Sequence, residues 1–364
     1  MAVGVVGRTK VNLMQLGCHK LSAPGLRNAV IRSRLAGALQ RSGGNLTTYP
    51  IDHETEHGRL AYFLKGMLPG FDPGALVDVA KEGRVLAMAV LPSLGQVVGQ
   101  HTKGDMPLIW KLNRGAGANL NGDSVTVRLY SNVEAAMRAG IDNGAITWGA
   151  TYYHGSQNAP EMLRQIAEMD EAGAKLGLGG VVWNYPRGSQ VKAGDAEVFY
   201  QLDGFEAITN AAPASLVLVK EKVSTRPGKT ENPVTEWEAG DLEGLGWGKP
   251  GAKGVNEDVV RRFLTLDRGA QIQFMVAIQH DRGIGSLMSG GAPQKPDQFL
   301  LDVADGLGTA DAGTLGFRHL ALIAGRSTTA QILRNPSTGL YNLTGAIAHF
   351  KALDDAAPRV TIEV

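Results

Sequence analysis

The chain has 364 residues, of which 43% are hydrophobic, enough to bury the core of one large barrel domain with a terminal extension. Its 36 Lys and Arg residues nearly balance its 35 Asp and Glu residues, which gives a formal net charge of +1. This balance argues against a protein that binds nucleic acids or membrane surfaces, because both partners favour a basic excess. It leaves a small anionic substrate open, since a phosphate pocket needs only a few local donors.

The single cysteine and the N-terminal sequence bear on cellular location. Cys18 cannot form an intrachain disulfide, which favours a reducing compartment. The N-terminus has no basic region followed by an apolar core and a cleavage site, as a secretory leader would have. The longest apolar runs are also far shorter than the ~20 residues that a membrane helix needs. We therefore expect a cytoplasmic protein with no membrane partner.

Residues 1–45 precede the regular part of the sequence and contain a predicted helix at 26–41. A helix placed before the first strand has two plausible roles, covering the base of a barrel or packing between subunits. We treat 1–45 as an N-terminal extension, and we expect the protein to be a homo-oligomer.

From residue 46 to residue 364, short apolar runs alternate with longer amphipathic stretches, as is typical of βαβ units and a parallel sheet. Apolar residues follow helical spacing at 132–140 and 160–173, and similar stretches lie at 258–266 and 298–307. Eight strands with eight crossovers favour a closed (β/α)8 TIM barrel, whereas five or six would favour an open doubly wound sheet. The predicted strands are residues 46–51, 84–91, 108–112, 145–151, 178–185, 215–220, 283–288 and 319–324.

A long segment rich in Gly, Pro, Glu and Lys follows the sixth predicted strand, at residues 224–256. A loop of this length inside a compact domain is usually functional or mobile. In a barrel, the loops that follow the strands surround the mouth where active sites lie. We therefore expect this insertion to lie over the candidate site.

Lys220 ends the sixth predicted strand, directly after the apolar run 216–219. A lysine is costly there unless the strand end opens on a polar cavity, where partial desolvation and a second cation favour the neutral amine. Lys111 ends the third strand at the same mouth and could be that cation. A neutral lysine can attack a ketone. Lys220 is therefore a candidate nucleophile. The alternative is that Lys220 only caps the strand in solvent. We expect the neighbouring Lys222 to be solvated.

Two aromatic side chains lie at the end of the fifth predicted strand. Trp183 and Tyr185 are two positions apart, so they point to the same side of the strand. A phenol beside an iminium can move protons, and an indole can position a substrate. Alternatively, both rings only fill the barrel interior.

The ends of the last two predicted strands carry glycine-rich turns. Ser289, Gly290 and Gly291 follow the seventh strand, and Gly325 and Arg326 follow the eighth. Barrels often bind phosphate in the loops after these two strands. Glycine lets backbone N–H groups approach phosphate oxygens, and arginine adds charge-assisted hydrogen bonds. These residues are our candidates for binding a substrate phosphate.

Residues 53–57 read His-Glu-Thr-Glu-His, which is literally a zinc-protease pattern. Such proteases carry the pattern within an amphipathic helix and add a third ligand downstream. Here threonines and a proline precede it, which indicates the end of a strand. We therefore expect no metal and no other cofactor.

In chain order, the strand ends read D-H-x-x-x-H-G, K-L-N, G-A-T-x-Y-x-G-S, W-x-Y-P-R-G, V-K, S-G-G and G-R. This series resembles the archaeal-type class I fructose-bisphosphate aldolases, which also occur in bacteria. The resemblance runs from about Asp52 to the C-terminus, and GATYYHGS and VVWNYPRGS are its most specific parts. It implies a Schiff-base enzyme that reversibly cleaves fructose 1,6-bisphosphate to dihydroxyacetone phosphate and glyceraldehyde 3-phosphate, in glycolysis and gluconeogenesis.

The resemblance also implies roles for single residues. Lys220 would form the Schiff base and Tyr185 would be the general acid/base, with Trp183 beside it. Asp52 and His57 would contact the substrate, with Asp52 in the catalytic group. The last two loops would hold the C1 phosphate of dihydroxyacetone phosphate.

Other substrate contacts are less specific. Lys111 and Arg187 complete the predicted substrate-binding set. A glutamate that the family carries in the loop after the sixth strand has two alternative candidates here, Glu231 and Glu236, both in the insertion.

Several other functions remain open at this point. Relatives that share the barrel and the lysine include a thiolase acting on a phosphorylated dione and a transaldolase-like synthase of the aromatic pathway. A metal-dependent aldolase would need three histidines at strand ends, and no such trio is evident in the sequence. A non-catalytic phosphate-binding barrel would not need Lys220, Tyr185 and Asp52 at three separate strand ends. The expected partner is a small phosphorylated sugar, with no nucleic acid.

Overall fold

A computed structural model of the chain describes a barrel and the segments packed on it. The described residues are 9–10, 24–44, 47–52, 73–116, 123–185, 187–190, 204, 206–223, 277–280, 322–323, 344, 347–348, 351 and 360–361. For 9–10, 220–223, 277–280, 322–323 and 360–361 the description is limited to the backbone.

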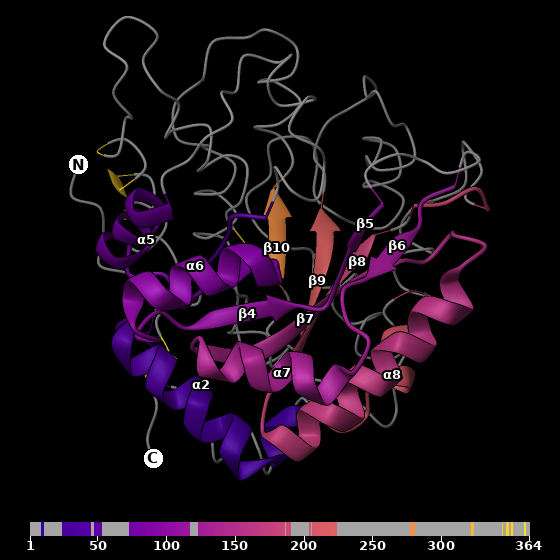
Figure 1. Cartoon of the computed structure of the whole chain (residues 1–364), viewed down its shortest axis with the longest axis horizontal. Coiled ribbons are helices and arrows are strands. Elements are labelled where there is room, and N and C mark those ends of the chain that lie inside the picture. The colour runs from indigo at the N-terminus through magenta and orange to yellow at the C-terminus, as the bar shows by residue number, and fades with distance from the viewer. Residues whose placement is uncertain are drawn as a thin grey trace, which may run out of the picture.

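Eight parallel strands close into a barrel, in the order β10-β11-β2-β3-β4-β7-β8-β9 around its circumference. Figure 1 labels β4, β7, β8, β9 and β10. Each strand pairs in parallel with the next around the ring, which requires a crossover connection between them. The predicted (β/α)8 barrel is confirmed. Its strands are β2 (Thr48–Pro50), β3 (Ala87–Val90), β4 (Leu108–Lys111), β7 (Ala145–Tyr153), β8 (Gly179–Tyr185), β9 (Leu216–Val223), β10 (Ala277–His280) and β11 (Leu322–Ile323).

Seven of the eight predicted strands overlap a strand of the barrel, and the seventh does not. It was predicted at 283–288, whereas β10 lies earlier, at Ala277–His280, paired between β9 and β11. The sequence before residue 280 carries the bulky and β-branched run Phe-Met-Val-Ala-Ile, which favours a strand. Two glycines weaken the later stretch, and 283–288 itself lies outside the described residues.

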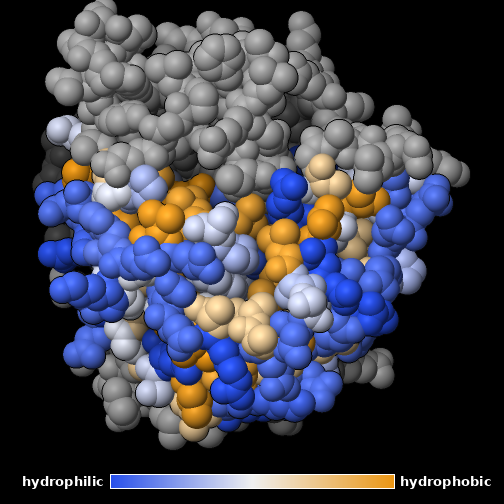
Figure 2. Space-filling model, viewed as in Figure 1, coloured by the Kyte–Doolittle hydropathy of each residue, from blue (hydrophilic) through white to orange (hydrophobic). Residues whose placement is uncertain are grey.

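Helices connect the strands and lie outside the barrel (Figure 1). The helical stretches predicted at 132–140 and 160–173 are confirmed as helices α7 and α8. Helices α5 and α6, which precede them in the chain, were not predicted. No helix in the described part of the chain has the length and apolar character needed to cross a membrane. Viewed from this side, the helices present mostly hydrophilic residues, with hydrophobic ones between them (Figure 2). Within the described residues, the helices between the strands from β2 to β8 are α5 (Pro73–Glu82), α6 (Pro92–Thr102), α7 (Val133–Asp142) and α8 (Ala159–Leu176).

Residues 24–41 of the predicted N-terminal extension lie at the base of the barrel. A short 3-10 helix, η1 (Pro24–Arg27), leads into α2 (Ala29–Arg41). Arg34 donates to the carbonyl of Ala145 at the start of β7, at 3.2 Å, and Arg41 donates to a backbone carbonyl just before β3, at 2.7 Å. Helix α2 thus lies across the N-terminal ends of the strands (Figure 1), which is the first of its two predicted roles.

Two short pairs of strands lie outside the barrel sheet. β5 (Asn113–Gly115) and β6 (Thr126–Arg128) pair antiparallel in the connection between β4 and α7. β1 (Thr9–Lys10) and β12 (Val360–Thr361) pair in parallel, which joins segments near the two ends of the chain. Because β5 begins where β4 ends, the first pair lies at the carboxyl end of the barrel.

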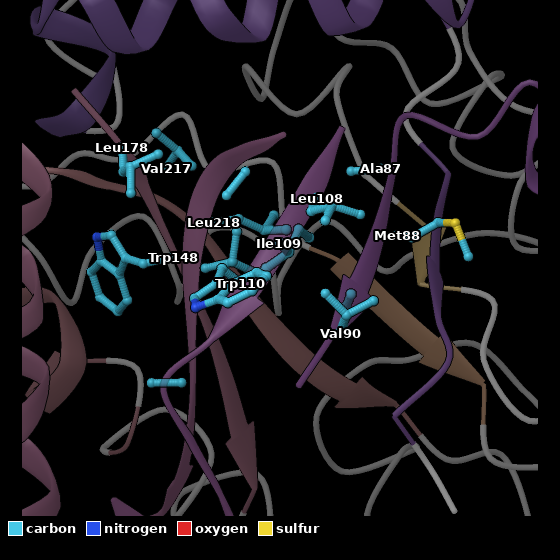
Figure 3. Close-up of a cluster of buried hydrophobic side chains, with 14 of the residues drawn as sticks. Ala87, Met88, Val90, Leu108, Ile109, Trp110, Trp148, Leu178, Val217 and Leu218 are labelled. Carbon is cyan, nitrogen blue, oxygen red and sulfur yellow. The ribbon is translucent and has the colours of Figure 1, made fainter. Parts of the chain in front are cut away.

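Tryptophans between the strands and the helices show which face of the sheet points outward. Trp110 lies against Gly95 of α6 and Gly140 of α7, where an added Cβ would come within 2.3 and 2.8 Å of its ring. Trp148 lies against Gly173 of α8 in the same way, at 2.4 Å. Apolar side chains from several strands gather around these rings (Figure 3). Since side chains alternate along a strand, the neighbours of these tryptophans face the barrel interior.

Candidate active site

The register of four neighbouring strands brings several predicted site positions to one face. Lys111 of β4 pairs with Gly149 of β7, and Thr151 pairs with Trp183 of β8. Trp183 in turn pairs with Lys220 of β9. Residues in register share a face of the sheet, and Lys111 and Gly149 directly follow the outward-facing tryptophans. These positions therefore belong to the interior face at the carboxyl end of the barrel.

Asp52 and Lys111 form a buried ion pair at this end. The ammonium Nζ of Lys111 donates to Oδ2 of Asp52 at 2.8 Å, and the two side chains are 2% and 5% exposed, in the order Lys111 and Asp52. The same Nζ lies 4.9 Å from the centre of a Trp183 ring, a cation–π contact. A buried ion pair persists only with good geometry, because both charges have left water. Lys111 is thus a fixed positive charge of the barrel mouth.

Tyr185 and Arg187 lie next to each other at the end of β8. The guanidinium carbon of Arg187 is 5.0 Å from the centre of the Tyr185 ring, and both residues are half-buried. Within the described part of the chain, the buried Nε of Arg187 has no hydrogen-bond acceptor. Buried donors nearly always have a partner, so Arg187 is well suited to receive an anionic group.

Two further tyrosines lie on β7, and sequence reasoning had singled out neither. Tyr153 pairs in register with Tyr185, and their ring centres are 5.9 Å apart. Tyr152 faces the other side, with its hydroxyl 3.1 Å from Nδ1 of His154. Burial raises the pKa of Tyr152 to about 12, so this phenol keeps its proton at neutral pH. Tyr185, on the interior face, has the guanidinium of Arg187 over its ring.

The remaining predicted site residues are only partly described. The backbone of Lys220 lies between Trp183 on one side and Ala277 of β10 on the other. The other candidates lie outside the described residues, and so do the residues of the His-Glu-Thr-Glu-His pattern and of the insertion 224–256. Those candidates are His57, Ser289, Gly290, Gly291, Gly325, Arg326, Glu231 and Glu236.

Gly149 leaves the room in which Trp183 and Lys111 meet. A Cβ at this position would lie 2.9 Å from the Trp183 ring and 3.1 Å from Cγ of Lys111. We expect Gly149→Ala to lower the free energy of unfolding by about 1–3 kcal/mol, the usual cost of overpacking, as measured by urea denaturation. Gly37→Ala is the matched control, because it adds a methyl group with nothing within 4 Å on a helix, and it should be neutral or stabilising. Equal effects of both variants would contradict this packing.

Sequence reasoning also missed Asp123, a buried carboxylate in the loop that leads into β6. It accepts hydrogen bonds from the loops that follow β7 and β8. Its partners come from distant parts of the chain, and no local pattern marks it. Only the fold brings these groups together.

The sequence that builds this face is similar to a known group of aldolases. Residues 46–223, which include β2 through β9 and the position of Lys220, match the model of the DeoC/LacD family aldolases. The matched residues therefore include Asp52, Lys111, Trp183 and Tyr185, and also the strands that carry them.

Curated proteins similar to this chain come from bacteria and archaea. The chain is 29% identical over 187 residues to a probable fructose-bisphosphate aldolase class 1 of Chlamydia trachomatis, covering 51% of this chain and 52% of that protein. It is also 29% identical over 149 residues to a fructose-bisphosphate aldolase class 1 of Halobacterium salinarum, covering 41% of this chain and 54% of that protein. The match spans about half the length of these relatives.

Solved aldolase structures share the fold. One is an archaeal fructose-1,6-bisphosphate aldolase whose catalytic lysine is covalently bound to the carbinolamine intermediate of the substrate. Its TM-score is 0.56 at 20% identity, covering 90% of this chain and 99% of that one. Another is the fructose-bisphosphate aldolase of Slackia heliotrinireducens, with a TM-score of 0.57 at 18% identity, covering 94% of this chain and 96% of that one. At these identities the likeness is one of fold.

Proposed function

We propose that the chain is a class I fructose 1,6-bisphosphate aldolase that holds its substrate as a Schiff base on Lys220. The observation that carries this proposal is the register of Lys220 with Trp183, beside the buried Asp52–Lys111 pair. Curated relatives named class 1 fructose-bisphosphate aldolases support it. The structurally similar archaeal enzyme with a covalently bound lysine supports the same chemistry. Such an enzyme would act in glycolysis and gluconeogenesis, in the cytoplasm, as a homo-oligomer.

The reaction would begin at the lysine. The neutral amine of Lys220 adds to the C2 ketone of the sugar, and the carbinolamine loses water to give an iminium. Tyr185, as its phenolate, takes the proton of the C4 hydroxyl, and the electrons of the C3–C4 bond move into the iminium as glyceraldehyde 3-phosphate leaves. The enamine that remains is protonated at C3 and hydrolysed, which releases dihydroxyacetone phosphate and restores the lysine.

The buried ion pair would prepare the nucleophile. A fixed cation near an amine disfavours a second positive charge, so Lys111 favours the neutral, reactive form of Lys220. Asp52 fixes the position of Lys111 through the 2.8 Å hydrogen bond. Because both side chains are buried, their charges act through a medium that screens them less than water does. In this proposal Asp52 also contacts the substrate.

Substrate phosphates would bind at the mouth of the barrel. Arg187 offers a half-buried guanidinium whose Nε has no acceptor among the described residues. We assign the other phosphate to the loops after the seventh and eighth strands, with Gly290, Gly291 and Arg326. Donors fixed in advance orient the substrate at little cost when the reaction occurs.

A cleavage assay with metal removal tests this function. The purified chain should convert fructose 1,6-bisphosphate to triose phosphates, and exhaustive dialysis against EDTA should leave the rate nearly unchanged, because the iminium accepts the electrons. Fructose, which lacks both phosphates, is the matched control and should react far more slowly. Loss of activity that zinc restores would favour a metal-dependent aldolase. Turnover of a phosphorylated dione alone would favour the related thiolase.

A further inference from the structure

Asp123 carries a carboxylate whose two oxygens each accept two hydrogen bonds. Oδ1 accepts from the backbone N–H groups of Ser124, at 2.9 Å, and Ser189, at 2.8 Å. Oδ2 accepts from the hydroxyl of Ser156, at 3.0 Å, and the backbone N–H of Gln157, at 2.9 Å. Asp123 is 7% exposed. An ionised carboxylate has about four acceptor sites, so these donors nearly saturate it.

These donors come from separate loops at the carboxyl end of the barrel. Further hydrogen bonds join the two loops after β7 and β8: Gln190 N–H donates to Gly155 O at 2.8 Å, and His154 N–H donates to Tyr185 O at 3.1 Å. Gly188 has φ +133°, and a Cβ there would lie 2.1 Å from the backbone of Gly155. The loop that carries Arg187 is therefore held closely against its neighbour.

The charge state of Asp123 fits this role. Burial alone would raise the pKa of its carboxyl group, but the hydrogen bonds from Ser189, Gln157, Ser156 and Ser124 together hold that pKa below its ordinary value. Asp123 is therefore ionised at neutral pH and acts only as an acceptor. All four hydrogen bonds from Ser124, Ser156, Gln157 and Ser189 need an acceptor at this position.

We propose that Asp123 is a positioning residue of the active site, which holds the segment carrying Tyr185 and Arg187 through its hydrogen bond to Ser189. The inference rests on the proposed function, in which Tyr185 moves the proton and Arg187 binds a phosphate. Ser189 lies two positions after Arg187, and the Arg187 guanidinium lies over the Tyr185 ring at 5.0 Å. Asp123 acts on the reaction through this segment.

Asp123→Asn keeps the size of the side chain and removes half of its acceptors. The new NH2 group would face at least one backbone N–H that the carboxylate now binds, so one loop must move. A shift of about 1 Å in a reacting group can cost 10²-fold in rate. We expect kcat/KM for cleavage to fall by about that factor, with a rise in KM because Arg187 is displaced.

Asp170→Asn is the matched control. Asp170 of α8 accepts from the backbone N–H groups of Ala214, at 2.8 Å, and Ser215, at 2.7 Å, and from the Ser215 hydroxyl, at 2.7 Å. This donor set resembles that of Asp123, but it lies at the start of β9, away from the barrel mouth. The variant should lower stability and leave kcat/KM within about twofold of the wild type.

A double-mutant cycle gives the decisive readout, with kcat and KM measured for Asp123→Asn, Arg187→Ala and the double variant. If Asp123 acts through Arg187, adding Asp123→Asn to Arg187→Ala should change KM little, because coupled sites are not additive. Multiplied effects on KM, or equal activity losses in Asp123→Asn and Asp170→Asn, would overturn the inference.

Amide hydrogen exchange of residues 184–190 tests the same contact without turnover. Exchange should be faster in Asp123→Asn than in the wild type and unchanged in Asp170→Asn. A wild-type chain that neither cleaves nor traps the substrate would refute the proposed function. Unchanged exchange in Asp123→Asn would refute the positioning role, whichever way the activity assay turns out.

Discussion

Replacing Lys220 with alanine should reduce cleavage of fructose 1,6-bisphosphate to the background rate. The variant lacks the amine that forms the iminium, and no neighbouring group supplies the same electron sink. Lys111 cannot take over in this account, because its ammonium is held in the buried pair with Asp52 at 2.8 Å. A coupled assay of triose phosphate release measures the loss.

Lys222→Ala is the matched control for this variant. It removes the same kind of side chain two positions further along β9, where the backbone pairs with Gln279 of β10. We expect it to keep most of the activity, since we assign no step to Lys222. Cleavage at the wild-type rate by Lys220→Ala would disprove the assignment of the nucleophile, and a total loss in Lys222→Ala would move the assignment along the strand.

Tyr185→Phe should lower the rate of cleavage by about 10²–10⁴-fold, the usual contribution of a general acid or base. The variant removes only the hydroxyl, so Trp183 and Arg187 should still hold the substrate. Borohydride should therefore still trap dihydroxyacetone phosphate on Lys220, while carbon–carbon cleavage fails. The two variants thus lose different steps, which single-turnover cleavage and trapping can separate.

Tyr152→Phe is the control for the loss of a phenol. It lies close to Tyr185 in the barrel but on the opposite face of the sheet, where its hydroxyl contacts His154. We expect a cost in stability of about 1 kcal/mol for the lost hydrogen bond, with cleavage nearly unchanged. Full activity in Tyr185→Phe would leave that tyrosine only a packing role.

Much of the fold was predictable because the strands of a barrel are buried on both faces and read as apolar runs. The first half of β9, residues 216–219, is such an apolar run. Helix α8 was predictable for a different reason, because its apolar residues follow helical spacing. The seventh strand was misplaced because two apolar runs lie close together around residue 280, and only pairing with β9 distinguishes them. Helix α5, which has only 10 residues, was missed, and α6 was missed because Gly95 and Gly99 interrupt its helical pattern.

The candidate site was predictable only where it lies at strand ends. Lys111 and Asp52 were both expected at the barrel mouth, but their pairing depends on the closure of the barrel, which no sequence spacing encodes. Asp123 was not predictable, since its donors come from loops that the fold alone brings together. The family resemblance supplied the roles of Tyr185 and Lys220, which residue chemistry alone left open.

The most direct test of the central claim is to locate the covalent adduct on the wild-type chain. Incubation with dihydroxyacetone phosphate, reduction with borohydride and digestion should give one modified peptide, and fragmentation in the mass spectrometer should place the added mass on Lys220. Lys111 and Lys222 should be unmodified in the same digest. No added mass, or mass on Lys111 or Lys222, would contradict the account.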